Sequence, residues 1–228
     1  MSPQQKQLAL FKSPFAIPEI ATRQPTEAYL VDKLRKKVYE WRSDHYKGAT
    51  DISQKLLSHW FYRDHLVDNR TFKYFFCQRE AIETLIYLYE VKKIRTLKEL
   101  QPFYSERMDK QIALDLFKDS KKEAGDNQKY PKYCFKMATG SGKTKVMSLA
   151  IVWAYFNQYA KNFLILAPNV IVFERLCEDF ANGKVFLKDP LIPEDLKGDW
   201  QLRYILRGNE PSLIKDGSLV LLNIDQIR

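Results

Sequence analysis

The chain has 228 residues, 45% of them hydrophobic and 29% charged, which excludes a disordered or fibrous protein and allows one large or two small folded domains. Its three cysteines, Cys77, Cys134 and Cys177, are odd in number and far apart, so we expect buried or idle thiols rather than disulfides or a zinc site. No apolar run is long enough to cross a bilayer and no signal-peptide core is present, so we expect a cytoplasmic protein without a membrane partner. The formal charge of +9 suits a polyanionic partner such as nucleic acid, although charge alone is weak evidence.

Residues 1–69 predict a mostly helical N-terminal region that begins with a loosely held arm. Residues 1–24 show no sustained hydrophobic period, which indicates the arm. A first helix is expected from Pro25, since proline suits the first turn of a helix, and Thr50 can cap a second helix. The predicted apolar faces are Val31, Leu34, Val38 and Trp41 in the first helix and Ile52, Leu56, Leu57 and Trp60 in the second.

Residues 70–130 predict a helix followed by a polar insertion. An aromatic extended stretch from Phe72 to Phe76 leads into a helix from about Gln78 to Lys92. Residues 94–130 are polar and only partly helical in pattern, and the stretch EAGDNQKYP predicts a flexible loop.

Residues 131–228 alternate between strand and helix patterns. Four short apolar runs predict strands, in the order KYCFKM, NFLILAP, WQLRYIL and SLVLLNI. Two helices are expected between them, KTKVMSLAIVWAYFNQYA and NVIVFERLCEDFANG, the second ended by Asn182 and Gly183. This alternation predicts an α/β fold with a parallel sheet, and the continuous apolar run at 164–166 predicts a strand covered on both faces.

The stretch MATGSGKT, from Met137 to Thr144, has the composition of a phosphate-binding loop between a strand and a helix. A triphosphate needs many converging donors and little steric bulk, which the backbone N–H groups of a glycine-rich turn and a helix N-terminus provide. We therefore predict a site for ATP and Mg²⁺ whose residues are Thr139, Gly140, Ser141, Gly142, Lys143 and Thr144. Lys143 can reach the β- and γ-phosphates, and the Thr144 hydroxyl can ligate Mg²⁺.

Met137 stands where the general pattern of such loops has a glycine. In this respect the loop resembles the first motif of superfamily-two helicases and translocases, in which that glycine is often absent. The upstream stretch YFFCQREAIETLIYLYE resembles the Q-motif of the same helicases. The resemblance implies that the Gln78 amide, which both donates and accepts, pairs with the adenine edge of ATP. It also implies that an insertion at about 94–130 is looped out between Gln78 and the loop.

Two further stretches resemble helicase motifs that face nucleic acid. NFLILAPNVIVFERL resembles the motif called Ia, which implies that N–H groups near Pro168 and Asn169 contact a nucleic-acid phosphate. The alternative, an ordinary strand-to-helix turn, stays open. SLVLLNIDQIR resembles the later strand whose end also faces the nucleic acid, which implies contacts from Asn223 and Gln226.

Together these stretches resemble the N-terminal portion of the restriction subunit of type III restriction enzymes and its DEAD/DEAH-box relatives, well over residues 70–228 and loosely over 1–69. The resemblance implies an incomplete first RecA-like lobe, with its P-loop sheet, over residues 131–228. It implies an ATP-dependent DNA helicase or translocase that couples ATP hydrolysis to movement on double-stranded DNA. It also implies endonuclease activity in the intact protein and a methyltransferase, or modification subunit, as partner.

Hydrolysis in this superfamily also needs an Asp-Glu pair at the end of an apolar strand. The run LVLLN ends in Asn223 where the aspartate is expected, and Asp225 comes two residues late. We therefore expect the acidic strand to follow Arg228, and the present chain to bind nucleotide weakly and not to hydrolyse it. Two alternatives stay open: a non-hydrolysing nucleotide-binding regulatory module, and a non-enzymatic interaction domain in which the loop is vestigial.

Overall fold

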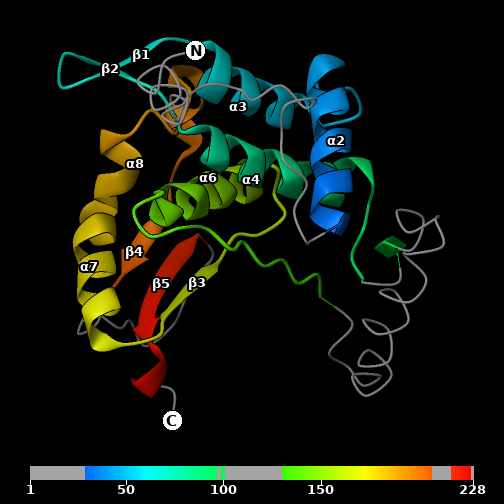
Figure 1. Cartoon of the computed structure of the whole chain (residues 1–228). Helices are drawn as coiled ribbons and strands as arrows, with labels where there is room; N and C mark the ends of the chain where they lie inside the picture. The colour runs from blue at the N-terminus through cyan, green and yellow to red at the C-terminus, as the bar shows by residue number, and fades with distance from the viewer. Residues whose placement is uncertain (1–28, 97–98, 101–129, 207–216, 227–228) are drawn as a thin grey trace, which may run out of the picture. The chain divides into compact units, whose positions relative to one another are not determined.

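A computed structural model describes residues 29–96, 99–100, 130–206 and 217–226 (Figure 1). The predicted arm, the helix start at Pro25 and most of the polar insertion lie outside the described residues. The chain forms two compact units, and each takes its residues from two stretches of sequence. Unit 1 comprises Met1–Thr50 and Phe75–Ala138, and unit 2 comprises Asp51–Tyr74 and Thr139–Arg228. The three-region division expected from the sequence stays a prediction.

Unit 1 is helical in its described residues. Its elements are α2 (Tyr29–Ser43), α4 (Phe76–Ile86) and the π-helix η2 (Tyr87–Val91), and α2 packs against α4. The predicted helix after the aromatic stretch is therefore confirmed, with its last turn widened into a π-helix. The predicted apolar face of α2 is buried at Leu34, Val38 and Trp41, whereas Val31 is 39% exposed and lies at the margin of that face.

A buried ionic cluster joins α2 to α4. The Glu83 carboxylate is fully buried and accepts hydrogen bonds from Arg42, from Arg79 Nε at 2.8 Å and from the Tyr46 hydroxyl at 2.6 Å. Burial alone would lower the pKa of Arg42, but the hydrogen bonds and negative charge of Glu83 outweigh burial and raise it. Two guanidinium groups thus depend on one carboxylate that is out of contact with water.

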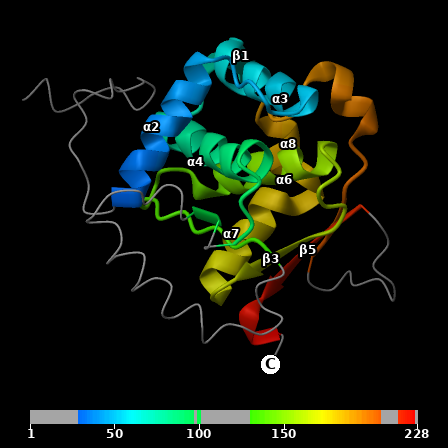
Figure 2. The same cartoon turned by 90° about the vertical axis from the view of Figure 1, so that its right-hand side faces the viewer.

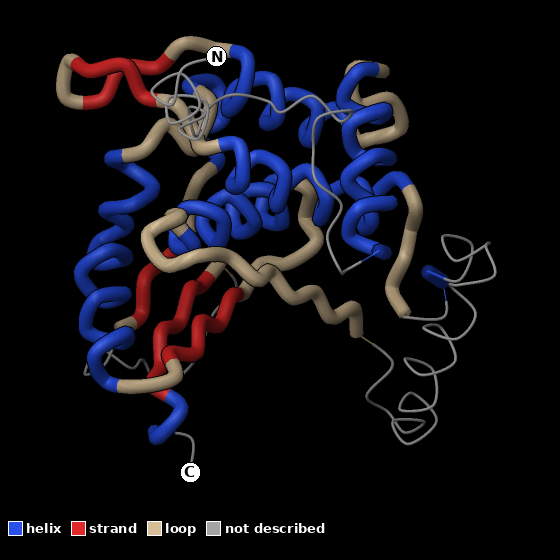
Figure 3. Tube along the Cα trace, in the orientation of Figure 1, coloured by secondary structure: helices blue, strands red, loops and turns tan. Residues whose placement is uncertain are grey.

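Unit 2 contains a three-stranded parallel sheet, shown in Figure 3 beside a separate hairpin. The strands are β3 (Phe163–Ala167), β4 (Arg203–Ile205) and β5 (Ser218–Asn223), and β5 lies in the middle and pairs in parallel with both neighbours. The predicted α/β class with a parallel sheet is confirmed at this level. The hairpin is antiparallel and consists of β1 (His65–Val67) and β2 (Arg70–Phe72).

Helices of unit 2 cover part of this sheet and extend beyond it. The helix α7 runs along the sheet and contacts β3 and β5 (Figures 1 and 2). Asn182 and Gly183 have left-handed backbone angles, as expected for a helix end, but a further short helix follows them. The helical elements of unit 2 are α3 (Asp51–Tyr62), α6 (Lys143–Phe156), α7 (Val170–Phe180), η5 (Ala181–Gly183), α8 (Lys184–Lys188), η6 (Glu194–Asp199) and η7 (Ile224–Gln226).

The core of unit 2 joins α3 to α6 through tryptophan side chains whose polar atoms are bonded. Trp153 donates from Nε1 to Ser53 Oγ at 3.0 Å, and Trp60 donates from Nε1 to the Leu191 carbonyl at 2.7 Å. Trp60 is 2% exposed, so the prediction that Trp41 and Trp60 serve the core is confirmed by their burial. These contacts hold α6, the helix that follows the predicted phosphate-binding loop.

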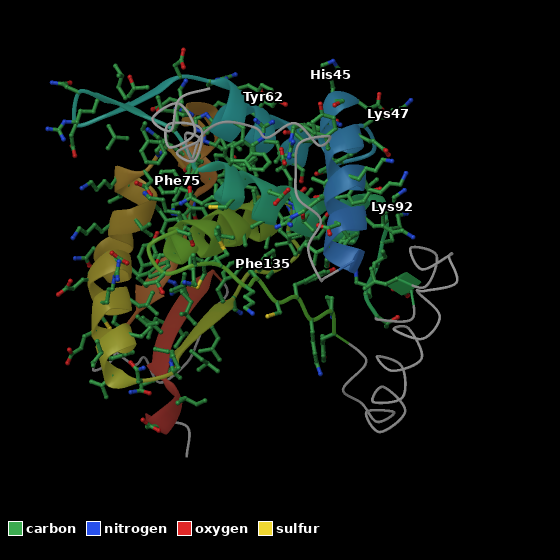
Figure 4. All side chains as sticks on the ribbon, in the orientation of Figure 1. His45, Lys47, Tyr62, Phe75, Lys92 and Phe135 are labelled. Carbon is green, nitrogen blue, oxygen red and sulfur yellow. The ribbon has the colours of Figure 1, made fainter. Side chains whose placement is uncertain are left out.

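The strand predicted before the loop is absent from the structure. Residues 131–138 form no strand and pair with none of the described strands, and Cys134, Phe135 and Lys136 are exposed (Figure 4). Within this stretch the Tyr133 hydroxyl donates to the Ile94 carbonyl at 2.9 Å, which ties the segment to unit 1. The apolar run is short and flanked by lysines, so local pattern overestimated its tendency to pair.

The prediction that residues 164–166 are covered on both faces is wrong for the described chain. Ile165 is 6% exposed, but Leu164 and Leu166 are 57% and 46% exposed. β3 lies at the edge of the three-stranded sheet, and only the face that carries Ile165 and Ala167 is buried. The thiols of Cys77 and Cys134 are also exposed rather than buried.

We predict that Glu83→Gln lowers the free energy of unfolding by about 3–5 kcal/mol, because it leaves the guanidinium groups of Arg42 and Arg79 buried without a counter-charge. Urea unfolding monitored by circular dichroism measures the change. The matched control is Glu40→Gln, which breaks an exposed pair with Lys37 and is expected to cost less than about 1 kcal/mol. Equal effects of the two substitutions would contradict the assigned role of Glu83.

His59 is a second group whose environment opposes its charged form. Its Nε2 lies 3.1 Å from the Pro190 carbonyl, its ring centroid is 4.6 Å from that of His65, and its buried Nδ1 has no partner among the described residues. Burial and the positive charge of His65 lower the pKa of His59 from 6.5 to about 4.

We predict that the free energy of unfolding falls as the pH is lowered from about 6.5 to about 4. Over this range the unfolded chain binds a proton at His59 that the folded chain does not bind. His59→Gln keeps a donor for Pro190 and should flatten this part of the pH profile in urea titrations. The control is His45→Asn at an exposed, left-handed position, which should leave the profile as in the wild type.

Candidate nucleotide-binding site

The loop before α6 makes a sharp turn with left-handed glycines. Gly140 and Gly142 have φ angles of +78° and +77°, a region that L side chains rarely adopt. Gly142 occupies the N-cap position of α6, and no side chain of the described residues caps this helix start. The turn therefore exposes the backbone around a helix N-terminus, the arrangement that favours a bound anion.

The side chains of the loop supply a cation and hydroxyl groups. Lys143 and Thr139 are exposed, and Ser141 and Thr144 are half-buried. The predicted ATP residues 139–144 are thus contiguous on one turn of unit 2, with Lys143 as the first residue of α6. Their roles toward the phosphates, and that of Thr144 toward Mg²⁺, stay predictions.

A second lysine in the same helical turn has a different role, which the sequence analysis missed. Lys145 forms an ion pair with the Asp189 carboxylate, which is 7% exposed, and its Nζ lies 4.9 Å from the centroid of the Phe72 ring. Asp189 thus fixes Lys145 on the protein side of α6. No local pattern could have revealed this pair, because the partners are 44 residues apart.

The buried side of helix α6 anchors the loop. Val146, Leu149 and Val152 are buried, and the Ser148 hydroxyl donates to the Thr144 carbonyl at 2.9 Å. The neighbouring Tyr74 hydroxyl is buried without a partner among the described residues, and burial, reinforced by the charge of Asp189, raises its pKa.

Gln78 lies in the first turn of α4, in unit 1, and is 2% exposed. Its Oε1 accepts a hydrogen bond from the Phe75 N–H at 2.9 Å, so the amide satisfies a backbone donor at the start of the helix. The structure therefore gives Gln78 a helix-capping role that the sequence analysis did not foresee. Its pairing with adenine stays a prediction.

The predicted nucleic-acid residues lie together at one edge of the sheet. Ala167 pairs in register with Asn223, so Pro168 and Asn169 follow β3 at the carboxyl edge where β5 ends. Asn169 caps α7 by accepting from the Val172 N–H at 2.9 Å, whereas Asn223 is 5% exposed and accepts from the Asp225 N–H at 3.2 Å.

The structure does not bring residues 139–144 and the predicted nucleic-acid residues to one place. In Figures 1 and 2 the start of α6 and the carboxyl ends of β3 and β5 lie at different levels of unit 2. Residues 139–144 and the residues after β3 are therefore two separate candidate sites in this conformation.

Two further searches of the described residues gave negative results. No group of three or more His, Cys, Asp or Glu side chains in the described ranges could hold a metal ion. No helix within those ranges is both long and apolar enough to span a membrane.

The family model described as "Type III restriction enzyme, res subunit" matches residues 71–226, about two thirds of the chain. The chain belongs to this family. The match to the Res-subunit family contains α4, the glycine loop, α6 and all three strands of the parallel sheet, and it leaves out α2 and α3. Neither the curated proteins nor the solved structures give a match to the chain.

Membership of the Res-subunit family confirms the resemblance seen in the sequence. The family consists of ATP-hydrolysing helicase domains that bind ATP and process DNA. The loop described above lies within the matched residues, and its role in binding nucleotide stays a prediction.

We predict that Gly140→Ala lowers the free energy of unfolding by about 1–2 kcal/mol, because alanine is strained at a φ of +78°. The matched control is Gly198→Ala. A Cβ at either position would meet no atom within 4 Å, but Gly198 does not have a left-handed backbone. The difference between the two variants in the free energy of unfolding, measured with urea, should therefore report the backbone strain alone. Equal losses of stability in both variants would show that the left-handed turn is not required.

Proposed function

We propose that residues 139–144 bind the triphosphate of ATP and that the chain serves an ATP-dependent DNA helicase or translocase acting on double-stranded DNA. The observation that carries the proposal is the left-handed turn at Gly142, which begins an uncapped helix with the exposed Lys143 at its first position. A phosphate group would meet backbone N–H groups, the positive end of α6 and an ammonium group.

Lys143 and Lys145 have different environments, and this difference supports the assignment. Lys145 is paired with Asp189 and would keep that partner when nucleotide binds. Lys143 is exposed at the first position of α6, beside the glycine turn, so its ammonium group is placed to reach the β- and γ-phosphates. Thr144, next along α6, would ligate Mg²⁺ through its hydroxyl.

The finer parts of the proposal rest on family membership. A RecA-like lobe, hydrolysis coupled to movement, pairing of Gln78 with adenine, and a modification subunit as partner all belong to this level. Residues Pro168, Asn169 and Asn223 would face DNA at the carboxyl edge of the sheet. For Asn223 this requires the turn at Asp225 to open, because its amide oxygen is now bonded to the Asp225 N–H.

We predict that Lys143→Ala weakens ATP binding about tenfold to a hundredfold, the loss expected for a charge-assisted hydrogen bond worth about 1.5–3 kcal/mol. Titration calorimetry with Mg-ATP measures the affinity. Lys184→Ala is the control, since it removes the same charge from an exposed position in the same unit and should leave the affinity unchanged.

An unchanged affinity of Lys143→Ala would overturn the proposal and favour an interaction domain with a vestigial loop. ATP binding that depends on Lys143 but never responds to double-stranded DNA, in the chain or in any longer form of the protein, would favour a regulatory nucleotide-binding module. These outcomes separate the three hypotheses with one variant and one added ligand.

A further inference from the structure

The basic charge of the protein is unevenly divided between its two units. In the described residues of unit 1, twelve lysines and arginines stand against seven aspartates and glutamates. In the described residues of unit 2 the same comparison gives twelve against eleven. Among the described residues, the excess that suits a polyanion therefore lies in unit 1 rather than in unit 2, which carries the glycine loop.

Most carboxylates of unit 1 are bonded within the unit, which leaves several of its exposed lysines without an ion pair to a described carboxylate. Glu83 is buried with Arg42, and Glu90 accepts from the Thr50 N–H at 3.0 Å. The other pairs are Asp32 and Glu80 with Arg35, Glu40 with Lys37, and Glu99 with the N–H groups of Arg95 and Thr96. Among the described carboxylates of unit 1, only the exposed Asp44 has no such bond.

Besides Lys136, which lies close to the glycine loop in the sequence, four lysines of unit 1 are exposed and form no ion pair with any described carboxylate: Lys36, Lys47, Lys92 and Lys93. Helix α2 carries the first, the turn after α2 carries the second, and the end of η2 carries the last two. We call these four the lysine surface. Figure 4 shows Lys47 and Lys92 on the same side of α2.

Contacts of two aromatic side chains connect the parts of unit 1 that carry Lys47 and Lys92. The Trp41 and Tyr87 ring centroids are 5.3 Å apart, Trp41 donates from Nε1 to the Lys47 carbonyl at 3.0 Å, and Lys92 Nζ lies 5.3 Å from the Tyr87 centroid. The turn at Gly48 also approaches η2, since a Cβ there would lie 3.7 Å from Val91 Cγ1. The lysine stems thus project from fixed backbone, which suits a partner with regularly spaced charges.

We propose that the lysine surface of unit 1 binds the phosphate backbone of double-stranded DNA, independently of nucleotide and without reading base sequence. Lysines act as point charges toward phosphate oxygens, and neutralising each phosphate releases a condensed counterion from the duplex. Two of the four, on α2 and in the turn after it, lie outside the stretch matched by the family model. The choice of DNA among polyanions rests on the proposed function.

The test is the binding of a short labelled duplex of mixed sequence to the full chain, over a series of salt concentrations and without ATP. The variant Lys47→Gln/Lys92→Gln/Lys93→Gln should bind more weakly and lower the slope of log affinity against log salt by about three, roughly one per phosphate contact. The control variant Lys161→Gln/Lys184→Gln/Lys197→Gln removes the same charge from exposed positions of unit 2 and should bind as the wild type.

Equal loss in both triple variants would show a response to net charge alone and would overturn the proposal, as would no loss in either. Vesicles containing phosphatidylserine provide a second polyanion. If they bind through the lysine surface while the duplex does not, the partner is a membrane and the proposal is wrong. Urea unfolding confirms that each variant folds, and calorimetry with Mg-ATP shows separately whether the glycine loop binds nucleotide, so either proposal can fail alone.

Discussion

The left-handed backbone at Gly142 determines where α6 begins, and the candidate nucleotide site depends on that one turn. Because the helix starts there, Lys143 lies at its exposed end and Lys145 lies two residues further round, against Asp189 and Phe72. A shift of the helix start by one residue would rotate both side chains by about 100° and take Lys145 away from Asp189. Backbone conformation, rather than the lysines themselves, therefore decides which ammonium group is exposed beside the turn.

Unit 1 shows the same separation of inner and outer charge on a larger scale. Most of its carboxylates form bonds within the unit. The clearest case is Glu83, where two guanidinium groups share one buried counter-charge. A buried cluster of this kind contributes little net stability but tolerates no loss of a partner. Several exposed lysines of the unit form no ion pair with a described carboxylate, and this is the basis on which we propose that the surface attracts a polyanion.

Family membership and the structure give different kinds of information about the predicted functional residues. The match to the Res-subunit family covers the glycine loop and the parallel sheet, where ATP binding and DNA processing are expected. The structure adds contacts that the motifs do not reveal, such as the pair of Lys145 with Asp189 and the hydrogen bond from the Phe75 N–H to Gln78. Both constrain how the motif residues can act, because each fixes a side chain or backbone group next to a predicted ligand contact.

The sequence by itself determined the features that depend on local pattern. The glycine loop, the start of α6, the strands β3, β4 and β5, and the family all follow from spacing and composition over a few residues. Tertiary structure decided what depends on distant partners. The stretch 131–138 forms no strand because pairing needs a neighbour, and Leu164 is exposed because β3 lies at an edge. Asp189 and Glu83 acquired their roles only when residues about 40 positions away packed against them, which no local pattern encodes.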